Sequence, residues 1–195
     1  MVKFNVVLFD GFETLDAMGP AEIVGKMPTT YSLQYFSLHG GLVTSSQNVQ
    51  VYTSSLHQIS KGILLVPGGM GTRTLVDDSA FIHELTRVAN ISSYVLTVCT
   101  GSALLAKTGL LQGRHATSNK GAFGWVQSVH EGVLWEKQAR WVVDGNFYTS
   151  SGVSAGMDMM LGFIADLHGQ GAAENIAKLI EYIWNADKNH DPFAV

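Results

Sequence analysis

The stretch that decides the fold runs from Tyr94 to Ala106 and reads YVLTVCTGSALLA. It begins with apolar and β-branched residues, which favour a buried strand, and ends in Ala and Leu, which favour a helix. Cys99 stands at the junction, and Gly101 follows two residues later. A nucleophile on a sharp turn between a strand and a helix forms a nucleophile elbow, here with sulfur in place of the usual serine oxygen. The stretch therefore predicts an α/β fold with a cysteine nucleophile elbow.

Two interpretations of Cys99, the only cysteine of the chain, follow from its position. A thiol at a helix N-terminus feels the positive end of the helix dipole, which lowers its pKa and populates the reactive thiolate. The alternative is a small, inert, buried hydrophobic residue, which is the role of most lone cysteines. The strand–Cys-x-Gly–helix context favours the catalytic interpretation.

Short apolar runs alternate with helical patterns along the rest of the chain. The predicted strands are Phe4–Phe9, Tyr31–Leu38, Val49–Tyr52, Ile63–Val66, Val95–Val98, and Ala139–Val143 with Phe147–Ser150, a hairpin joined by Asp144-Gly145-Asn146. The predicted helices are Ala17–Met27 with Pro20 in its first turn, Ser79–Ala89 with Ser79 as N-cap, a helix ending near Lys107, Gly121–Val129, Ala155–Leu167 and Ala172–Trp184. Continuous apolar strands that alternate with helices indicate a mainly parallel sheet covered on both faces. With no linker or repeat, residues 1–195 are predicted to form a single domain.

Several polar motifs follow strand ends. In sheets of this kind the ligand lies beyond the carboxyl ends of the strands. Cys99, Gly68 and Gly69 each follow an apolar strand, and the segment Asp10–Asp16 follows the first one. We therefore expect these motifs to meet at one edge of the sheet.

Asp16 is the candidate acid–base partner of Cys99. A carboxylate and a thiolate in contact cannot both be charged cheaply in a buried pocket, so one proton is shared. The expected form is a neutral carboxylic acid that donates to the thiolate, which supplies a nucleophile and a proton donor together. A helix N-cap or first-turn acid is the alternative role for Asp16. Glu13 is the competing carboxylate, and the sequence does not separate the two.

Backbone amides are the predicted electrophile-stabilising groups. The amides of Gly68, Gly69 and Thr100 are expected to face the atom that the sulfur attacks, and close approach of backbone requires glycine. A tight turn after a strand is the alternative explanation of the two glycines. Asn119 either lines the pocket or makes an Asx turn before the next helix, and the turn is slightly favoured.

Bulk composition limits the class of protein. Charged residues make up 14% of the 195 residues, and the net charge is -4 with no cluster of Lys and Arg. We therefore predict no nucleic-acid or membrane partner, and a surface partly covered by a second subunit. The lone cysteine excludes an intrachain disulfide and fits a reducing, cytoplasmic location. None of the His residues has metal-ligand spacing, so no metal or cofactor is expected.

Four motifs together resemble the ThiJ/PfpI superfamily. They are Cys99-Thr100-Gly101-Ser102, Val66-Pro67-Gly68-Gly69, Leu15-Asp16-x-x-Gly19-Pro20 and the stretch Ser151–Asp158. The resemblance implies a flavodoxin-like three-layer sandwich related to class I glutamine amidotransferases, and usually a homodimer. The isocyanide hydratase branch is the nearest, since it carries Asp before the first helix and Val-Cys-Thr-Gly at the elbow. By position, Cys99 matches its nucleophile, Asp16 its acid–base residue, and the amides of Gly69 and Thr100 its electrophile-stabilising groups.

Departures from the family patterns narrow the range of activities that the resemblance implies. Isocyanide hydratases tend to have His where this chain has Asn119. This difference bears on which substrate is bound more than on the chemistry of the thiol. Peptidases of the PfpI type have His after the cysteine, where this chain has Thr100, and glutaminase domains need a His-x-Glu that this chain lacks. AraC-type regulators append a helix-turn-helix, for which a chain ending at Val195 leaves no room.

The resemblance implies a cysteine-dependent hydratase of a small electrophile, which turns an isocyanide into an N-substituted formamide through a thioimidate on Cys99. The alternatives are a sensor that oxidises Cys99 to a sulfinate, a cysteine amidase or hydrolase of another substrate, and a non-catalytic ligand-binding dimer.

Overall fold

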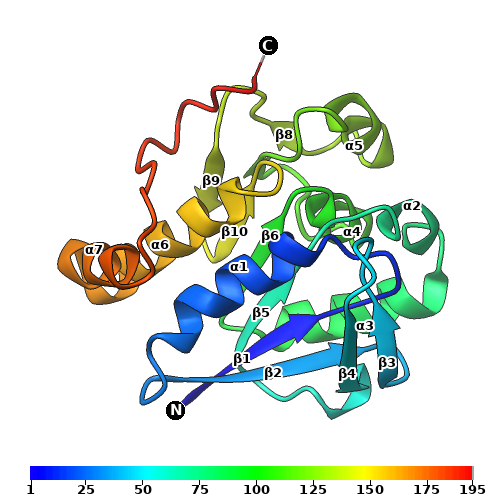
Figure 1. The fold of residues 1–195 in the computed structure, drawn as a ribbon. Helices are drawn as coiled ribbons and strands as arrows, with labels where there is room; N and C mark the ends of the chain where they lie inside the picture. The colour runs from blue at the N-terminus through cyan, green and yellow to red at the C-terminus, as the bar shows by residue number, and fades with distance from the viewer. Residues whose placement is uncertain (195) are drawn as a thin grey trace.

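One large sheet forms the centre of the protein (Figure 1). The computed structural model describes residues 1–194. The strands are β1 (Val2–Val7), β2 (Tyr31–Ser37), β3 (Gly41–Thr44), β4 (Gln50–Ser55), β5 (Ile63–Val66), β6 (Tyr94–Val98), β7 (His115–Ala116), β8 (Leu134–Trp135), β9 (Trp141–Asp144) and β10 (Phe147–Ser150). Eight of them form a sheet in the order β3-β4-β2-β1-β5-β6-β10-β9, and β7 pairs with β8. The inner pairs run parallel, while the edge pairs β3–β4 and β9–β10 run antiparallel.

Helices cover both faces of this sheet, which confirms the α/β class. The helices are α1 (Thr14–Gly25), α2 (Thr72–Leu75), α3 (Ser79–Ile91), α4 (Gly101–Lys107), α5 (Phe123–Val129), α6 (Ala155–His168) and α7 (Gln170–Leu179), with a short 3-10 turn at Leu56–Gln58. Packing contacts group α1 with α6 and α7, and α4 with α2, α3 and α5. Every residue of β5 is buried, because helices lie on both sides of it. This burial explains why the central strands are continuously apolar.

Some element boundaries differ from the prediction. Helix α1 begins at Thr14, so Pro20 lies inside it rather than in its first turn. The N-cap of α3 is Asp78 and not Ser79, because its carboxylate accepts hydrogen bonds from the amides of Ala80 and Phe81 at 3.0 Å. The last helix ends at Leu179 rather than Trp184, close to Glu181, whose φ of 53° leaves helical geometry.

One residue of the stretch Ser151–Asp158 has a structural role. Asp158 is buried and pairs with Arg140 at 2.6 Å. Its other oxygen, Oδ1, accepts hydrogen bonds from the Tyr182 hydroxyl and the Asn185 amide, both at 3.0 Å. This carboxylate therefore fastens the segment after α7 to α6.

The sheet brings the predicted motifs to one edge. Val66 of β5 pairs with Thr97 of β6, so the loops that leave these strands at Pro67 and Cys99 are neighbours. Phe12, in the loop after β1, forms a β-bridge with Gly69. The carboxyl ends of β1, β5 and β6 thus meet as expected. Within residues 1–194, no helix combines the length and the apolar character needed to cross a membrane.

Candidate active site

Cys99 occupies a strained turn between β6 and α4. Its φ is 56°, a left-handed conformation that non-glycine residues rarely adopt and that costs on the order of 1–3 kcal/mol. The Cys99 carbonyl accepts hydrogen bonds from the hydroxyls of Ser118 at 2.8 Å and Ser102 at 3.0 Å. Its amide donates to the Ser150 carbonyl at 3.1 Å. These bonds hold the backbone in the geometry of a nucleophile elbow.

Gly101 permits this turn to pack against the neighbouring strand end. A Cβ at this position would lie 2.7 Å from the Pro67 carbonyl oxygen, closer than real Cβ contacts allow. The glycine two residues after the cysteine is therefore required by the approach of the β5 loop.

A cavity of about 310 Å³ opens beside the sulfur. Its lining includes Cys99, Thr100, Gly69, Asn119, Glu13 and Arg73. Although Cys99 is only 6% exposed, it forms part of this wall. The thiol therefore faces a space large enough for a small molecule rather than sealed core.

Asp16 lies fully buried on the first turn of α1. Its Oδ2 accepts a hydrogen bond from the Gly68 amide at 2.9 Å. Burial raises the pKa of Asp16 to about 7, the Gly68 bond partly opposes this rise, and the charge of Glu13 adds to it. A carboxyl group that titrates near neutral pH is suited to accept and return a proton.

The Asp16 carboxyl and the Cys99 thiol are neighbours, since each shifts the pKa of the other. Asp16 Oδ1 is buried and accepts no hydrogen bond within residues 1–194. This oxygen is left free for the thiol proton. Asp16 does not line the cavity, so it acts at the sulfur and not at the far end of a ligand.

The predicted protonation state of the pair is wrong. Burial raises the pKa of Cys99 to about 12, and the negative charge of Asp16 raises it further, against hydrogen bonds from Thr100 that lower it. The resting pair is thus a neutral thiol beside a carboxyl group that ionises near pH 7, rather than a thiolate beside a carboxylic acid. Desolvation outweighs the dipole of α4 because Cys99 is removed from water.

The Asp16 charge has a measurable effect on folding. Its pKa is about 7 in the folded protein, against an ordinary value of 3.8, so the folded state retains a proton that the unfolded chain releases between these values. Raising the pH from about 4 to 7 therefore destabilises the fold, by up to about 1.4 kcal/mol per pH unit, and the effect levels off above pH 7.

We expect Asp16→Asn to remove this dependence. The difference in unfolding free energy between the Asp16→Asn variant and the wild type should grow in favour of the variant from pH 5 to 7 and then stay constant, as measured by urea titration. Asp77→Asn is the matched control, because the Asp77 side chain is 79% exposed. A difference that does not change with pH would contradict the assigned pKa.

The glycine amides do not all face the cavity. Gly68 was expected to offer its amide to the attacked atom, but that amide donates instead to Asp16. The Gly69 amide donates to the Thr100 hydroxyl at 3.1 Å. A hydrogen bond from the Thr100 amide is among the interactions that lower the pKa of the Cys99 thiol. Of the three amides, that of Thr100 is thus the one that acts on the reacting sulfur.

Close backbone packing explains the glycines. A Cβ on Gly68 would lie 2.6 Å from the Thr100 nitrogen and 2.9 Å from Asp16 Oδ2. Gly69 has a φ of 124°, and a Cβ there would lie 2.5 Å from the Glu13 nitrogen. The pair of glycines lets the three loops converge, which is how they support the site.

Asn119 has both of the roles that the sequence suggested. Its Oδ1 accepts a hydrogen bond from the Ala122 amide at 3.0 Å, which is the turn before α5. The same side chain lines the cavity. Glu13, the competing carboxylate, lines the cavity as well, and its Oε2 accepts from Gln47 Nε2 at 3.0 Å.

The sequence did not single out Arg73, Ser102 or Ser118. The two serines hold the Cys99 carbonyl, and Arg73 lines the cavity with its guanidinium 3.3 Å from the centre of the Trp125 ring. The distances of Arg73 and Ser118 from Cys99 along the chain carry no signal, because separate loops bring them to the site, whereas Ser102 is only three residues from Cys99, on the first turn of α4. Arg73 could have been noted as a charged residue in the loop after β5, where binding residues concentrate.

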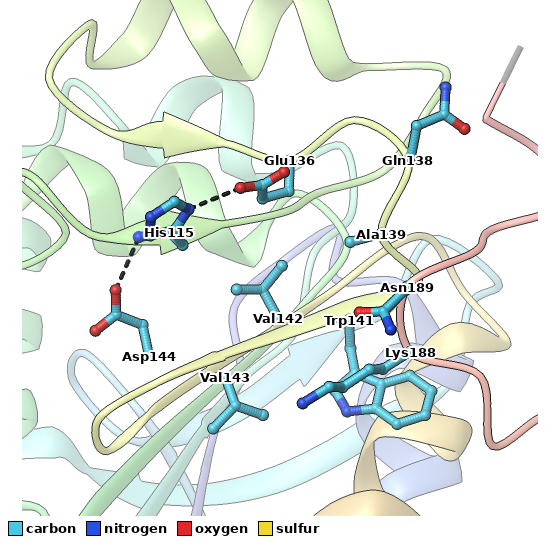
Figure 2. Close-up of a pocket in the computed structure, with 10 residues that line it drawn as sticks. All are labelled: His115, Glu136, Gln138, Ala139, Trp141, Val142, Val143, Asp144, Lys188 and Asn189. Atoms are coloured by element: carbon cyan, nitrogen blue, oxygen red, sulfur yellow. Dashed lines mark hydrogen bonds and ion pairs between the residues drawn. The ribbon is translucent and has the colours of Figure 1, made fainter.

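A second hollow of about 410 Å³ lies beside the edge strand β9 (Figure 2). His115 Nδ1 and Glu136 Oε1 form a pair at 2.7 Å there, and the His115 amide donates to Asp144 at 2.9 Å. Cys99 does not line it. Within residues 1–194, no three His, Cys, Asp or Glu residues are grouped closely enough to hold a metal ion.

Comparison with known proteins agrees with this geometry. The model of the DJ-1/PfpI family matches residues 2–166. The chain belongs to this family. Isonitrile hydratase of Pseudomonas putida is 30% identical over 93% of this chain and 78% of its own length. A ThiJ/PfpI family protein from Pseudomonas syringae has a TM-score of 0.85 and 26% identity, over 93% of this chain and 75% of that chain. The family and the flavodoxin-like α/β fold predicted from the sequence are thereby confirmed.

Transcriptional regulators are also similar to this chain. The HTH-type regulator CdhR of Pseudomonas aeruginosa is 29% identical over 90% of this chain, but this chain spans only 53% of that regulator's length. The chain is thus similar both to an enzyme and to a transcriptional regulator. Membership alone does not decide which activity this chain has.

Proposed function

We propose that this protein is a cysteine-dependent hydratase of a small electrophilic molecule, with isocyanides as its substrate class. The observation that carries the proposal is Cys99 on a strained elbow, lining a cavity and backed by a buried Asp16 whose pKa is about 7. The relation to isonitrile hydratase supports the choice of isocyanides.

The first step forms the bond between sulfur and carbon. Asp16 accepts the thiol proton as the Cys99 sulfur attacks the terminal carbon of the isocyanide, and then returns this proton to the same carbon. The product is a neutral thioimidate, in which carbon is bound to sulfur, to hydrogen and, by a double bond, to nitrogen. The Thr100 amide, which lowers the pKa of the Cys99 thiol, stabilises negative charge that develops on the sulfur.

Water completes the reaction. It adds to the thioimidate carbon, one of its protons goes to nitrogen, and the carbon–sulfur bond breaks. The sulfur leaves as a thiolate and recovers a proton through Asp16, and an N-substituted formamide is released. The sum is one isocyanide plus one water giving one formamide, so the reaction requires no oxidant or reductant.

The direct test is turnover and trapping. Purified protein should convert members of a panel of alkyl and aryl isocyanides to formamides, whereas nitriles, amides and aldehydes of matched size should react more slowly. Mass spectrometry of protein quenched during turnover should show Cys99 carrying the mass of one isocyanide. A panel in which no isocyanide reacts would overturn the proposal.

A ligand-binding module is the second candidate, favoured by the similarity to transcriptional regulators. In that case the same cavity would bind a small molecule without converting it. Recovery of unchanged isocyanide after equilibrium binding would identify this role. No feature of the site favours oxidative sensing by Cys99 over these two functions. The homodimer and the cytoplasmic location stay predictions.

A further inference from the structure

Arg73 is the cavity residue that the proposed mechanism does not use. It lies on α2, in the loop region after β5, and its guanidinium stacks on Trp125 of α5 with its central carbon 3.3 Å from the ring centre. Arginine stacks in this way through the flat face of its guanidinium, which leaves the N–H donors at the edge. The stack therefore fixes the direction in which these donors point.

The donors of Arg73 are incompletely satisfied. Nη1 is buried and makes no hydrogen bond within residues 1–194. No carboxylate of the described chain lies within ion-pair distance of the guanidinium, and Glu13 across the cavity bonds to Gln47 instead. Arg73 as a whole is only partly buried and lines the cavity, so its charge, which no protein carboxylate neutralises, is available to an anionic group of the ligand.

The chemistry of that partner follows from the guanidinium. Its planar fork of N–H donors matches the two oxygens of a carboxylate, which it binds through two parallel hydrogen bonds. The same cavity of about 310 Å³ contains Cys99, so one small molecule can contact both residues. Repulsion from Glu13 favours the Arg73 end of the cavity for an anion.

We infer that Arg73 is the specificity-determining residue of this cavity and that the substrate is a small molecule bearing a carboxylate, which Arg73 binds while Cys99 attacks the electrophilic carbon. The inference rests on the proposed function for the identity of that carbon, but the carboxylate site can be tested without turnover.

The turnover test compares acids with neutral amides of nearly equal shape. The pairs are isocyanoacetate with 2-isocyanoacetamide and 3-isocyanopropanoate with 3-isocyanopropanamide. In at least one pair the wild type should have a kcat/KM at least about tenfold higher for the acid, since hydrogen bonds to charged groups have this size. Arg73→Met should reduce this preference by about 10- to 100-fold, and Arg73→Lys should retain part of it.

Arg114→Met is the matched control. Arg114 also stacks on an aromatic ring, that of Phe147, but it pairs with Asp144 and does not line the cavity around Cys99. Its substitution should leave the ratio of acid to amide as in the wild type. An acid preference that survives in Arg73→Met, or that is lost equally in Arg114→Met, would overturn the inference.

The binding test separates this inference from the proposed function. Calorimetry on the Cys99→Ala variant should show N-formylglycine or N-formyl-β-alanine binding more tightly than the corresponding amide, and the added Arg73→Met substitution should abolish the difference. If no isocyanide is hydrated but this result holds, the hydratase proposal fails and the carboxylate site stands. If neither acid is preferred in binding or in turnover, the carboxylate site is refuted.

One other role of Arg73 has a different signature. If it served only to stabilise the Cys99 thiolate, Arg73→Met would slow the acids and the amides equally and would move the pH profile of Cys99 alkylation by iodoacetamide upward. That result would also overturn the inference.

Discussion

Cys99→Ala is expected to reduce formamide production by at least about 10⁴-fold, to the rate without protein, because no other group in the cavity can form the thioimidate. Cys99→Ser should be similarly inactive, since a hydroxyl beside Asp16 is a far weaker nucleophile than a thiol. Initial rates measured by infrared loss of the isocyanide band check this result. Residual turnover above about 1% in Cys99→Ala would remove the sulfur from the mechanism.

The inactive variants must be shown to fold. Cys99 adopts a φ of 56°, and its backbone is held by Ser118, Ser102 and Ser150, which do not depend on the thiol. Cys99→Gly is the informative control, because glycine accepts this conformation without strain. It should be inactive and yet more stable than Cys99→Ala, with a gain on the order of 1 kcal/mol. An inactive variant with raised stability cannot be explained by unfolding.

Much of the fold could be predicted from the sequence because burial leaves a strong pattern. Strand β5 begins and ends where its apolar run does, and the hairpin around Gly145 pairs β9 with β10 as the turn residues indicate. Strand β3 (Gly41–Thr44) was missed. It is a short edge strand that begins at the second of two consecutive glycines of positive φ and exposes Leu42, so its pattern is not that of a buried strand.

The sequence predicted which residues form the site but not which hydrogen bonds they make. Strand ends indicated that Cys99, Asp16 and the glycine pair would converge, since parallel strands place their carboxyl ends together. Which donor each amide meets depends on the approach of separate loops, so the bond from Gly68 to Asp16 leaves no mark in the sequence. The sequence suggested a lowered pKa for Cys99, whereas burial raises it. The start of a helix can be recognised in a sequence, but the depth to which a residue is buried cannot.

Asp16 and Glu13 differ in their surroundings, so substitutions at the two positions should have unequal effects on turnover. Asp16→Asn keeps an oxygen for the Gly68 amide but removes the proton acceptor beside the thiol, so kcat/KM is expected to fall by about 10²- to 10⁴-fold. Glu13→Gln, at the cavity wall and bonded to Gln47, should change it less than about tenfold. The reverse order of effects would transfer the acid–base role to Glu13.

A second measurement on Asp16→Asn distinguishes proton transfer from simple electrostatics, because the two act on the thiol in opposite directions. The Asp16 carboxylate raises the pKa of Cys99, so removing its charge should lower that pKa and speed alkylation of the thiol by iodoacetamide at pH 8. The limb of the turnover profile near pH 7, which reports the titration of Asp16, should disappear in the same variant. A thiol that becomes more reactive toward an alkylating agent while turnover falls is explained only if Asp16 moves the proton. If alkylation and turnover slow together, Asp16 instead serves to hold the elbow in place.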